Sequence, residues 1–280
     1  MAKAEGISVR LEAHAAAAAA SGKAGWLRAI AIPALEIACL IMFWQLMTLI
    51  IQSVFFPSPR LVLSSFWQLV VHGDIQGHGL FLHSWMSLLR VVKGFSLALL
   101  TAIPLGITFG LWGRIYDLGK ILVEPVRFIP PLAWVPLAII FMGGENRYTF
   151  IIWLGAFFPI LITTMTGVQS MDYGLVEVGQ VLGAGRWRVI TKVVLPAVGP
   201  HMIAGARLGM GTGWACIVAA EMIGGESTGL GRMIVNYGEL LQIDAVVVGM
   251  LAIGFLGYFL NEAFIFTEKK MFPWRKSARV

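Results

Sequence analysis

Charged side chains are scarce in this sequence of 280 residues: Asp, Glu, Lys and Arg make up 13% of it, against 58% hydrophobic residues. A soluble globular domain carries about 25% charged residues, so the composition argues against that class. The mean hydropathy is +0.80, and the apolar residues form long stretches typical of a chain that lies in a bilayer. The net charge of +6 does not indicate nucleic-acid binding, because the basic residues fall in tails and loops.

Cysteine is nearly absent as well. The two thiols, Cys39 and Cys216, both fall in apolar segments. Two such residues form neither a disulfide framework nor a metal site, so we expect small hydrophobic core residues. A cleavable signal peptide is also lacking, because residues 1–25 hold basic residues and an alanine run without a bounded apolar core. We interpret residues 1–25 as a cytoplasmic N-terminal tail.

Sites for chemistry are missing too. No G-x-x-x-x-G-K-[ST] loop, which would cradle nucleotide phosphates, occurs in the sequence. The glycine-rich run from Gly225 to Arg232 contains no lysine. No nucleophile and base are paired, so we predict that the chain is not an enzyme and holds no cofactor or metal itself. No two histidines lie on one helix at the spacing of metal ligands, so we expect all five to be solvated or interfacial. They are residues 14, 72, 78, 83 and 201.

Six apolar stretches approach the roughly 20 residues that a helix needs to cross the hydrocarbon core. They predict an all-α polytopic membrane protein with six transmembrane helices. Pro130, Pro131 and Pro136 interrupt the third stretch, and the fifth extends back past Arg207. The six stretches are 29–51, 94–113, 128–144, 148–171, 208–220 and 245–261.

The loops predict how the chain is organised. Lys and Arg are concentrated in alternate loops and in both tails, which places both termini in the cytoplasm. Arg90 and Lys93 lie against this trend, at the outer start of the second stretch. We predict a first transmembrane helix over 26–51, an outer amphipathic segment over 52–84, a membrane core over 85–266 and a basic cytoplasmic tail over 267–280.

The polar interval 170–200 is longer than a connection between two neighbouring helices requires. A helical pattern breaks at Gly183-Ala184-Gly185 and resumes with Trp187 before Pro196. Glycine permits a sharp turn inside such a pattern. We therefore predict two short helices joined by a glycine hinge, which project into the cytoplasm as a docking element.

This interval resembles the signature cytoplasmic loop of ABC-importer permeases: Glu-Ala-Ala, three residues, Gly, nine residues, then Ile-x-Leu-Pro. Glu177, Gly183 and the pair Leu195-Pro196 fall in register with it. The sequence departs from the pattern at Val178 and Gly179, where the family has alanines, and at Val193, where it has isoleucine. These replacements are small or conservative.

The resemblance covers residues from about 80 to 266. HSWMSLLRVVKGF, EPVRFIPPLAWVPLAIIFMG, GAFFPILITTMTGV and GARLGMGTGWACIVAAEMIGG are similar to segments of nitrate, sulfonate, taurine and bicarbonate permeases. It implies a type I ABC importer permease fold, with a coupling helix seated in a groove of a separate ATPase that holds ATP and Mg²⁺. The implied coupling residues are Glu177, Gly183, Ala184, Gly185, Arg186, Leu195 and Pro196.

The resemblance also implies partners and a substrate class. We expect a homodimer of permeases with two ATPase subunits and an extracytoplasmic substrate-binding protein, in a lipid membrane and without nucleic acid. Taurine or another sulfonate is the first choice of substrate, with nitrate or bicarbonate next. The alternative is a secondary ion-coupled transporter that acts alone, which predicts paired intramembrane carboxylates or inverted repeats. We see neither in the sequence.

Ionisable residues at membrane depth are costly and therefore candidates for function. Arg127 either pairs with Glu124, three residues earlier, or faces the pore as a guanidinium that attracts an anion. Arg207 either snorkels to the inner interface or lines the pore. We expect Glu221 to make a helix-terminal or gate hydrogen bond, and we assign no role to Glu36. The pore candidates are Arg127, Pro131, Trp134, Arg207, Gly209, Gly213 and Glu221.

Overall fold

The computed structural model describes residues 31–271, and all the regular structure within them is helical. The chain divides into two compact units, which meet between Leu63 and Ser64. The first unit contains the apolar helix Ala31–Ile51, in which Trp44 Nε1 donates a hydrogen bond to the Pro57 carbonyl at 3.1 Å. The predicted tail 1–25, with its alanine run, lies outside the described residues, as does most of the basic tail.

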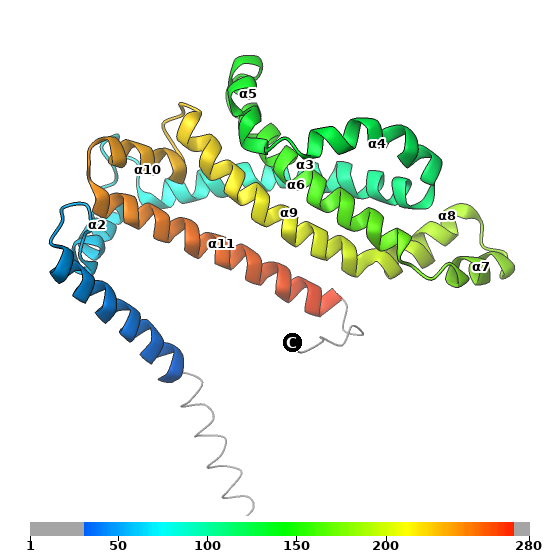
Figure 1. Cartoon of the computed structure of the whole chain (residues 1–280), viewed down its shortest axis with the longest axis horizontal. Coiled ribbons are helices and arrows are strands. Elements are labelled where there is room, and N and C mark those ends of the chain that lie inside the picture. Colours follow the sequence, from blue (N-terminus) through cyan, green and yellow to red (C-terminus); the bar gives the residue numbers. More distant parts are fainter. Residues whose placement is uncertain (1–30, 272–280) are drawn as a thin grey trace, which may run out of the picture. The chain divides into compact units, whose positions relative to one another are not determined.

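The second unit is built from consecutive helices (Figure 1). The helix α2, Pro59–Val71, crosses the boundary between the units, within the segment predicted to be amphipathic. The elements that follow are α3 Leu80–Leu111, α4 Gly113–Arg127, the 3-10 helix η1 Pro131–Trp134, α5 Val135–Phe141, α6 Asn146–Gln169, α7 Gly174–Val181, α8 Arg186–Val189, the π turn η2 Ile190–Val194, α9 Leu195–Ile223, α10 Leu230–Glu239 and α11 Ile243–Met271.

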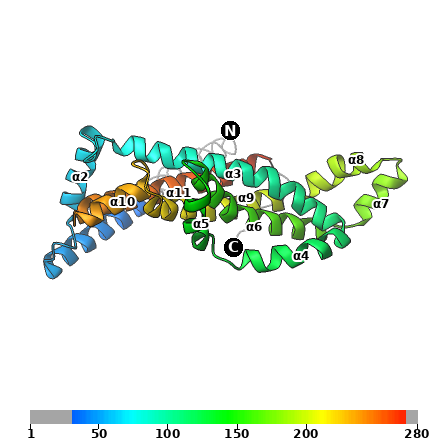
Figure 2. The same ribbon diagram turned by 90° about the horizontal axis from the view of Figure 1, so that it is seen from above.

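The core of this unit is the packing of α3 and α9 against α6 (Figures 1 and 2). Glycines make this packing close, because a helix without a Cβ lets a neighbouring helix approach its backbone. A Cβ on Gly94 of α3 would lie 2.6 Å from the Ile152 Cβ of α6, and one on Gly209 of α9 would lie 2.8 Å from the Ile160 Cγ1. Ile152 and Ile160 are fully buried, so α6 is the central helix.

The helices α10 and α11 cover α9. Trp214 of α9 donates its indole N–H to the Ile253 carbonyl of α11 at 3.3 Å. Met233 of α10 is fully buried, and a Cβ on Gly249 of α11 would overlap the side chains of Met233 and Ile234. Ser65 of α2 donates a hydrogen bond to the Asp244 carboxylate, which joins the end of α2 to the start of α11.

Among the described residues, five helices are long and apolar enough to cross a membrane, and the third of the six predicted spans, 128–144, contains only the short apolar helix Pro131–Phe141. This span is broken at the prolines that the sequence places in it and is not a single long helix. Pro130 is extended, with φ −55° and ψ 134°, and Met142 is extended at the other end. Proline supplies no backbone N–H, and Gly144 adopts a φ of +56°. These residues stop the helix at both ends.

The second span begins earlier than predicted. The sequence predicts 94–113, whereas α3 starts at Leu80. Arg90 and Lys93 therefore lie inside this helix and not in an outer segment. A search for charge-free stretches stops at Lys93 and therefore leaves out Arg90, although the side chain of Arg90 is buried in ion pairs within the protein.

Two further helices extend beyond their predicted ends. Helical structure runs without a break from Arg186 to Ile223, so the second helix of the predicted short pair is the beginning of the fifth span. The π turn η2 precedes Pro196, and its wider turn accommodates a residue whose ring would clash with the carbonyl four positions earlier. Residues 267–271, predicted as tail, continue α11.

Candidate functional site

The segment 170–200 forms a projection at one end of the second unit (Figures 1 and 2). The helix α7 ends at Val181, and the chain turns at Gly183, whose φ is +79°. Only glycine adopts this conformation without strain. The Ala184 N–H donates to the Gly179 carbonyl at 3.0 Å, and α8 then begins at Arg186. The structure therefore has the predicted glycine turn between two helices.

The base of this projection is held by apolar packing. Val189 and Val194 are buried against Val168 of α6 and Val198 of α9. Ala184 packs against the same cluster at its edge. The turn is therefore fixed to the two central helices and does not hang from a flexible linker.

The tip of the projection, in contrast, exposes large apolar side chains. Val181 is 87% exposed, Leu182 81% and Trp187 77%. We call these three residues the apolar tip. Contiguous apolar side chains on the surface mark contact sites for other molecules. Charged side chains lie on the same projection, because Glu177 on α7 and Arg186 on α8 are also exposed.

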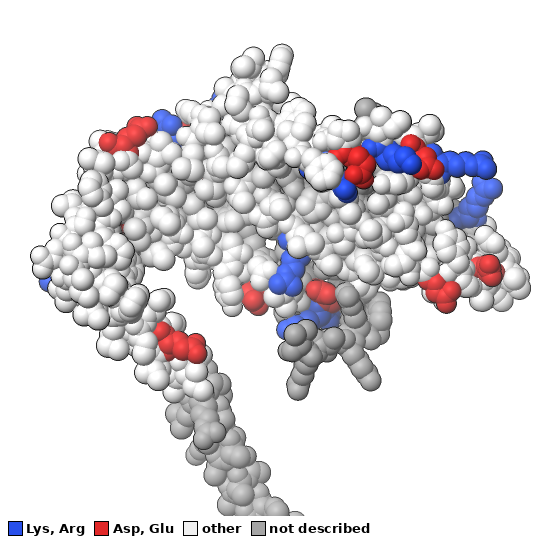
Figure 3. Space-filling view, viewed as in Figure 1, with Lys and Arg blue, Asp and Glu red and all other residues white. Residues whose placement is uncertain are grey.

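The remaining loop candidates lie along the same projection. Gly185 has φ −66° and ψ 163° and precedes α8. Leu195 is half-buried and Pro196 is exposed at the start of α9. Charged side chains gather at this end, over α4, α7 and α8, and another group lies below the middle of the unit, near the end of α11 (Figure 3).

A cavity of about 500 Å³ lies between the broken segment after α4 and the helices α6 and α9. Its walls are apolar apart from Arg127 and Thr212. The lining residues are Arg127, Phe128, Ile129, Pro130, Pro131, Leu132, Leu154, Gly155, Phe158, Pro159, Ile162, Thr212, Ala215 and Cys216. Ligand cavities have this composition, in which a few polar groups orient an otherwise apolar occupant.

Arg127 pairs with Glu124, which is one of the two alternatives left open by the sequence, and it also lines the cavity. Its Nη2 lies 2.8 Å from Glu124 Oε2, and its side chain is still 31% exposed. Its guanidinium carbon lies 4.8 Å from the centre of the Phe128 ring. The i, i+3 ion pair and the position at the cavity are therefore compatible.

The two other pore candidates near the broken segment, Pro131 and Trp134, differ in whether they line the cavity. Pro131 lines the cavity. Trp134 does not line it and packs edge-on against Phe150, with ring centres 6.4 Å apart. The indole N–H of Trp134 is buried and has no hydrogen-bond partner among the described residues.

The glycines of α9 pack within this chain. Gly209 contacts Ile160, and a Cβ on Gly213 would lie 3.3 Å from the Ile152 Cγ2. A Cβ on Gly211 would meet nothing within 4 Å, so this position is not closely packed. Arg207 lies on the exposed side, where its Nε donates to Asn261 Oδ1 of α11 at 2.8 Å.

Glu221 is the most deeply buried acid of the described chain, with no exposed side-chain area. Arg90 Nη1 donates to Glu221 Oε1 at 2.9 Å. Ser87 Oγ donates to both carboxylate oxygens, at 2.8 and 2.9 Å, and the Gly231 N–H donates at 3.0 Å. A buried carboxylate requires such pairing, so the gate or helix-terminal hydrogen bond expected of Glu221 is part of a larger cluster.

Arg90 extends this cluster to a second acid. Its Nε and Nη2 donate to the two oxygens of Glu145, at 2.8 and 2.7 Å, and its Nη1 donates to the Thr228 carbonyl at 2.7 Å. Hydrogen bonds from the Arg90 guanidinium hold the pKa of Glu145 below its ordinary value. The cluster joins α3, the start of α6, the end of α9 and the loop before α10.

The sequence reasoning missed Arg90 and Glu145. It placed Arg90 in an outer segment, because it ended the second span at the charge. The signal that could have found the cluster is the periodicity of α3: Ser87, Arg90 and Gly94 share one face at helical spacing. All three are buried.

The histidine expectation is wrong for His83. Its side chain is fully buried, and its Nε2 lies 3.1 Å from Asp74 Oδ2. Asp74, His78 and His83 come together at the start of α3. His72 is exposed, as expected.

Comparison with known proteins gives a consistent result. The family described as binding-protein-dependent transport system inner membrane component matches residues 102–266. An ABC transporter permease protein of Methanocaldococcus jannaschii is 38% identical over 252 residues, 88% of this chain and 91% of the relative. The taurine transport system permease protein of Escherichia coli is 32% identical over 237 residues, 84% of this chain and 86% of the relative.

Two more similarities extend this result. The nitrate import permease protein of Synechocystis is 31% identical over 246 residues, 86% of this chain and 89% of the relative. The fold resembles a solved structure of the MetNI methionine ABC transporter, with a TM-score of 0.60 and 17% identity, over 68% of this chain and 94% of that one. The likeness to MetNI concerns the fold alone.

Proposed function

The chain belongs to the family of binding-protein-dependent transport system inner membrane components, and we propose that it forms the membrane path of an ABC importer for a small oxyanion. Its relatives are permease subunits and not enzymes. The family resemblance and the fold class predicted from the sequence are thereby confirmed. Taurine or another sulfonate is our first choice of substrate, and nitrate or bicarbonate is next.

The observation that carries the proposal is the projection 170–200 with its apolar tip. The tip has no partner within the described chain, yet its base is fixed to α6 and α9 by buried valines. A surface of this kind suits a groove on a separate ATPase subunit, which would supply ATP and Mg²⁺. Closure of two ATPases would move the tip, and α9 would pass that movement into the membrane.

The cavity supports the substrate class. Arg127 is a guanidinium, whose planar N–H groups match the oxygens of a sulfonate, nitrate or bicarbonate. The other walls are almost entirely apolar, which suits the alkyl part of a sulfonate better than a fully hydrated inorganic anion. The similarity to a taurine permease and a nitrate permease supports the same class.

The assembly follows from the same proposal. We place both termini in the cytoplasm and the loop before α10 outside, where an extracytoplasmic binding protein would deliver the substrate. Two copies of the chain would line the path, and two ATPase subunits would bind their tips. In this orientation the charged end of the unit, near α7 and α8, faces the cytoplasm.

Charging the tip tests the coupling. Leu182→Asp places a carboxylate in the apolar tip and should abolish co-purification with the ATPase and transport-coupled ATP hydrolysis. Leu240→Asp is the matched control, because Leu240 is also exposed, at 52%, but lies after α10 at the other end of the unit. Equal ATPase binding by both variants would contradict the proposal.

Uptake tests the substrate. A strain without this chain should lose ATP-dependent uptake of labelled taurine, and the full-length chain should restore it. Unchanged uptake of taurine, nitrate and bicarbonate in the deletion strain would reject the oxyanion class. Uptake into liposomes by the chain alone, without ATP, would instead support a secondary transporter.

A further inference from the structure

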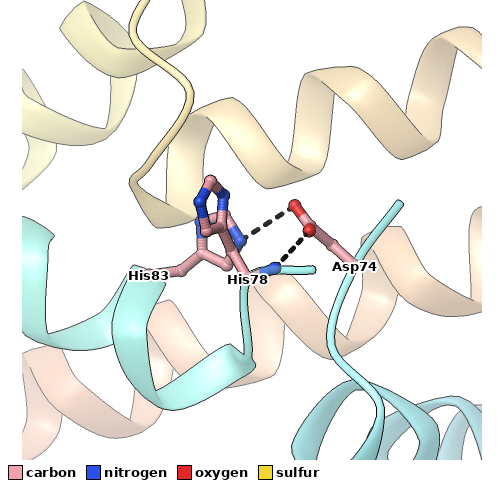
Figure 4. Close-up of side chains that lie close together, drawn as sticks. All are labelled: Asp74, His78 and His83. Carbon is pink, nitrogen blue, oxygen red and sulfur yellow. Dashed lines mark hydrogen bonds and ion pairs between the residues drawn. The ribbon is translucent and has the colours of Figure 1, made fainter. Parts of the chain in front are cut away.

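A group of three potential metal ligands lies where α2 and α3 are joined. Asp74, His78 and His83 each offer one ligand atom, and these atoms lie within 4.8 Å of one another (Figure 4). His83 is the fourth residue of α3, and the other two precede the helix. The group is separate from the cavity and from the apolar tip.

Asp74 is held in place as a ligand would be. Its side chain is 4% exposed. Its Oδ1 accepts hydrogen bonds from the Gln76 N–H at 2.9 Å and from the His78 N–H at 2.8 Å. These bonds leave Oδ2 to face His83 at 3.1 Å. A buried carboxylate needs a proton donor or a cation on each oxygen.

His83 is oriented in the manner of a metal-bound imidazole. Its Nδ1 lies 3.1 Å from both the carbonyl oxygen and the backbone nitrogen of Gly229, and its Nε2 lies 3.1 Å from Asp74 Oδ2. In one tautomer Nδ1 accepts from the Gly229 N–H and Nε2 donates to Asp74. In the other, Nδ1 donates to the Gly229 carbonyl and the lone pair of Nε2 is free to bind a metal ion. Metal-bound histidines nearly always use the second nitrogen in this way, to donate to a carbonyl or carboxylate.

The spacing of the first two ligand atoms also fits. Donors about 2.0 Å from a tetrahedral zinc ion lie about 3.3 Å apart, close to the 3.1 Å between His83 Nε2 and Asp74 Oδ2. The third donor, on His78, lies within 4.8 Å of them. Its ring would have to approach by about 1.5 Å to complete the same geometry. His78 belongs to a loop, which permits such a movement.

His78 supplies the observation that an ion pair between Asp74 and His83 does not explain. Its Nδ1 is buried and has no hydrogen-bond partner among the described residues. Leaving such an atom unsatisfied costs about 1–3 kcal/mol. A ligand between the three side chains would supply the missing contact.

We propose that Asp74, His78 and His83 bind a divalent transition-metal ion such as Zn²⁺. Imidazole and carboxylate together suit these ions, whereas Mg²⁺ and Ca²⁺ prefer oxygen ligands alone. The bound ion would join the loop after α2 to Gly229, next to the Thr228 carbonyl that Arg90 holds. It would thereby brace the end of the unit that contains the Arg90–Glu221 pair.

The test uses the purified full-length chain in detergent, without a histidine tag, and Zn²⁺ as the probe. Competition with a chromophoric chelator should give one tightly bound equivalent per chain. His78→Ala should weaken binding at least 10-fold, because it removes a ligand that makes no other side-chain hydrogen bond in the described structure. His72→Ala is the control, since His72 is exposed and outside the group.

Two readouts keep the result independent of folding. Zn²⁺ should raise the melting temperature of the wild type and of His72→Ala but not that of His78→Ala. Co²⁺ should give visible absorption bands with the same dependence on the variant. The proposal is overturned if the wild type binds no Zn²⁺, or if His78→Ala binds it as tightly as His72→Ala does.

Discussion

Arg90 of α3 and Glu221 of α9 are 131 positions apart in the sequence, and their side chains meet at 2.9 Å inside the protein. Neither side chain is more than 2% exposed. The pair joins two of the three central helices at the end of the unit that is remote from the apolar tip. Buried charges of this kind depend on each other, since an unpaired one is expensive to keep away from water.

Removing Arg90 should therefore destabilise the protein strongly. Arg90→Gln leaves the Glu221 carboxylate buried without its cation, and we expect a loss of about 3–5 kcal/mol in the free energy of unfolding. Reversible denaturation in detergent micelles measures it. Lys120→Gln is the control, because Lys120 forms an exposed pair with Asp117, and its loss should change stability little. Equal losses of stability in the two variants would show that the buried Arg90–Glu221 pair does not stabilise the protein more than an exposed pair does.

The Arg90–Glu145 pair should make stability depend on pH. Because the folded protein lowers the pKa of Glu145, the pair stabilises the protein above the ordinary Glu pKa of about 4.3. This contribution is lost as the pH falls through the lowered value. The melting temperature of the wild type should therefore exceed that of Glu145→Gln at pH 7, and the gap should close in acid. A gap that persists at the lowest pH would show that it has another cause.

The glycines of α9 should differ in their tolerance of a side chain. A Cβ at Gly209 would lie 2.8 Å from the Ile160 Cγ1 and 2.9 Å from the Ala156 carbonyl. Gly209→Ala should therefore cost about 1–3 kcal/mol by forcing α9 away from α6. Gly211→Ala meets nothing within 4 Å and should be neutral or slightly stabilising, because alanine favours helix. Denaturation in detergent micelles compares the two variants. Equal losses in the free energy of unfolding would mean that α9 does not pack against α6 through Gly209.

The turn at Gly183 should be sensitive to any side chain. Its φ of +79° lies in the left-handed region, which costs a residue with a Cβ about 1–2 kcal/mol. Gly183→Val should therefore misplace the apolar tip and reduce coupled ATP hydrolysis in the reconstituted complex. Gly238→Val is the control, because Gly238 lies in α10, outside the projection, and has open space around it. Full coupling in the Gly183 variant would show that the turn does not position the tip.

Arg127 should matter for uptake more than for folding. Its pair with Glu124 is partly exposed, so its removal should leave the melting temperature nearly unchanged. Arg127→Ala should lower oxyanion uptake at least several-fold, and Arg127→Lys should restore part of it, because lysine keeps the charge without the planar fork. Lys120→Ala, on the exposed side of the same helix, should have no effect. Normal oxyanion uptake by Arg127→Ala would show that Arg127 does not contact the transported anion.

The sequence predicts most of the apolar helices, because length and hydropathy alone define them. It also predicts the glycine turn, because Gly183 interrupts a helical pattern at a known spacing. It fails where charge lies inside a helix: a stretch that must be free of charge cannot contain Arg90. The partners of Arg90, Glu145 and Glu221, are far away in the sequence and are brought to it only by the packing of α3, α6 and α9.

The third predicted span is broken at its prolines, as their positions in the sequence indicate. Hydropathy does not register that prolines remove backbone donors, so an apolar run such as 128–144 resembles a full span although its helix covers only Pro131–Phe141. The irregular backbone is also what creates the cavity beside Arg127. Similarly, the spacing of Asp74, His78 and His83 follows no single helix, since a loop and a helix start supply them.

The unbroken helix from Arg186 to Ile223 has a mechanical consequence. At about 1.5 Å per residue, the distance along it from Arg186 to Glu221 is about 50 Å. It can therefore act as a rigid lever, with one arm beside the apolar tip and the other at the buried acid. A small tilt at one extremity becomes a displacement of several ångströms at the opposite one. The π turn, only a few residues from the tip, is the place where such a lever would flex.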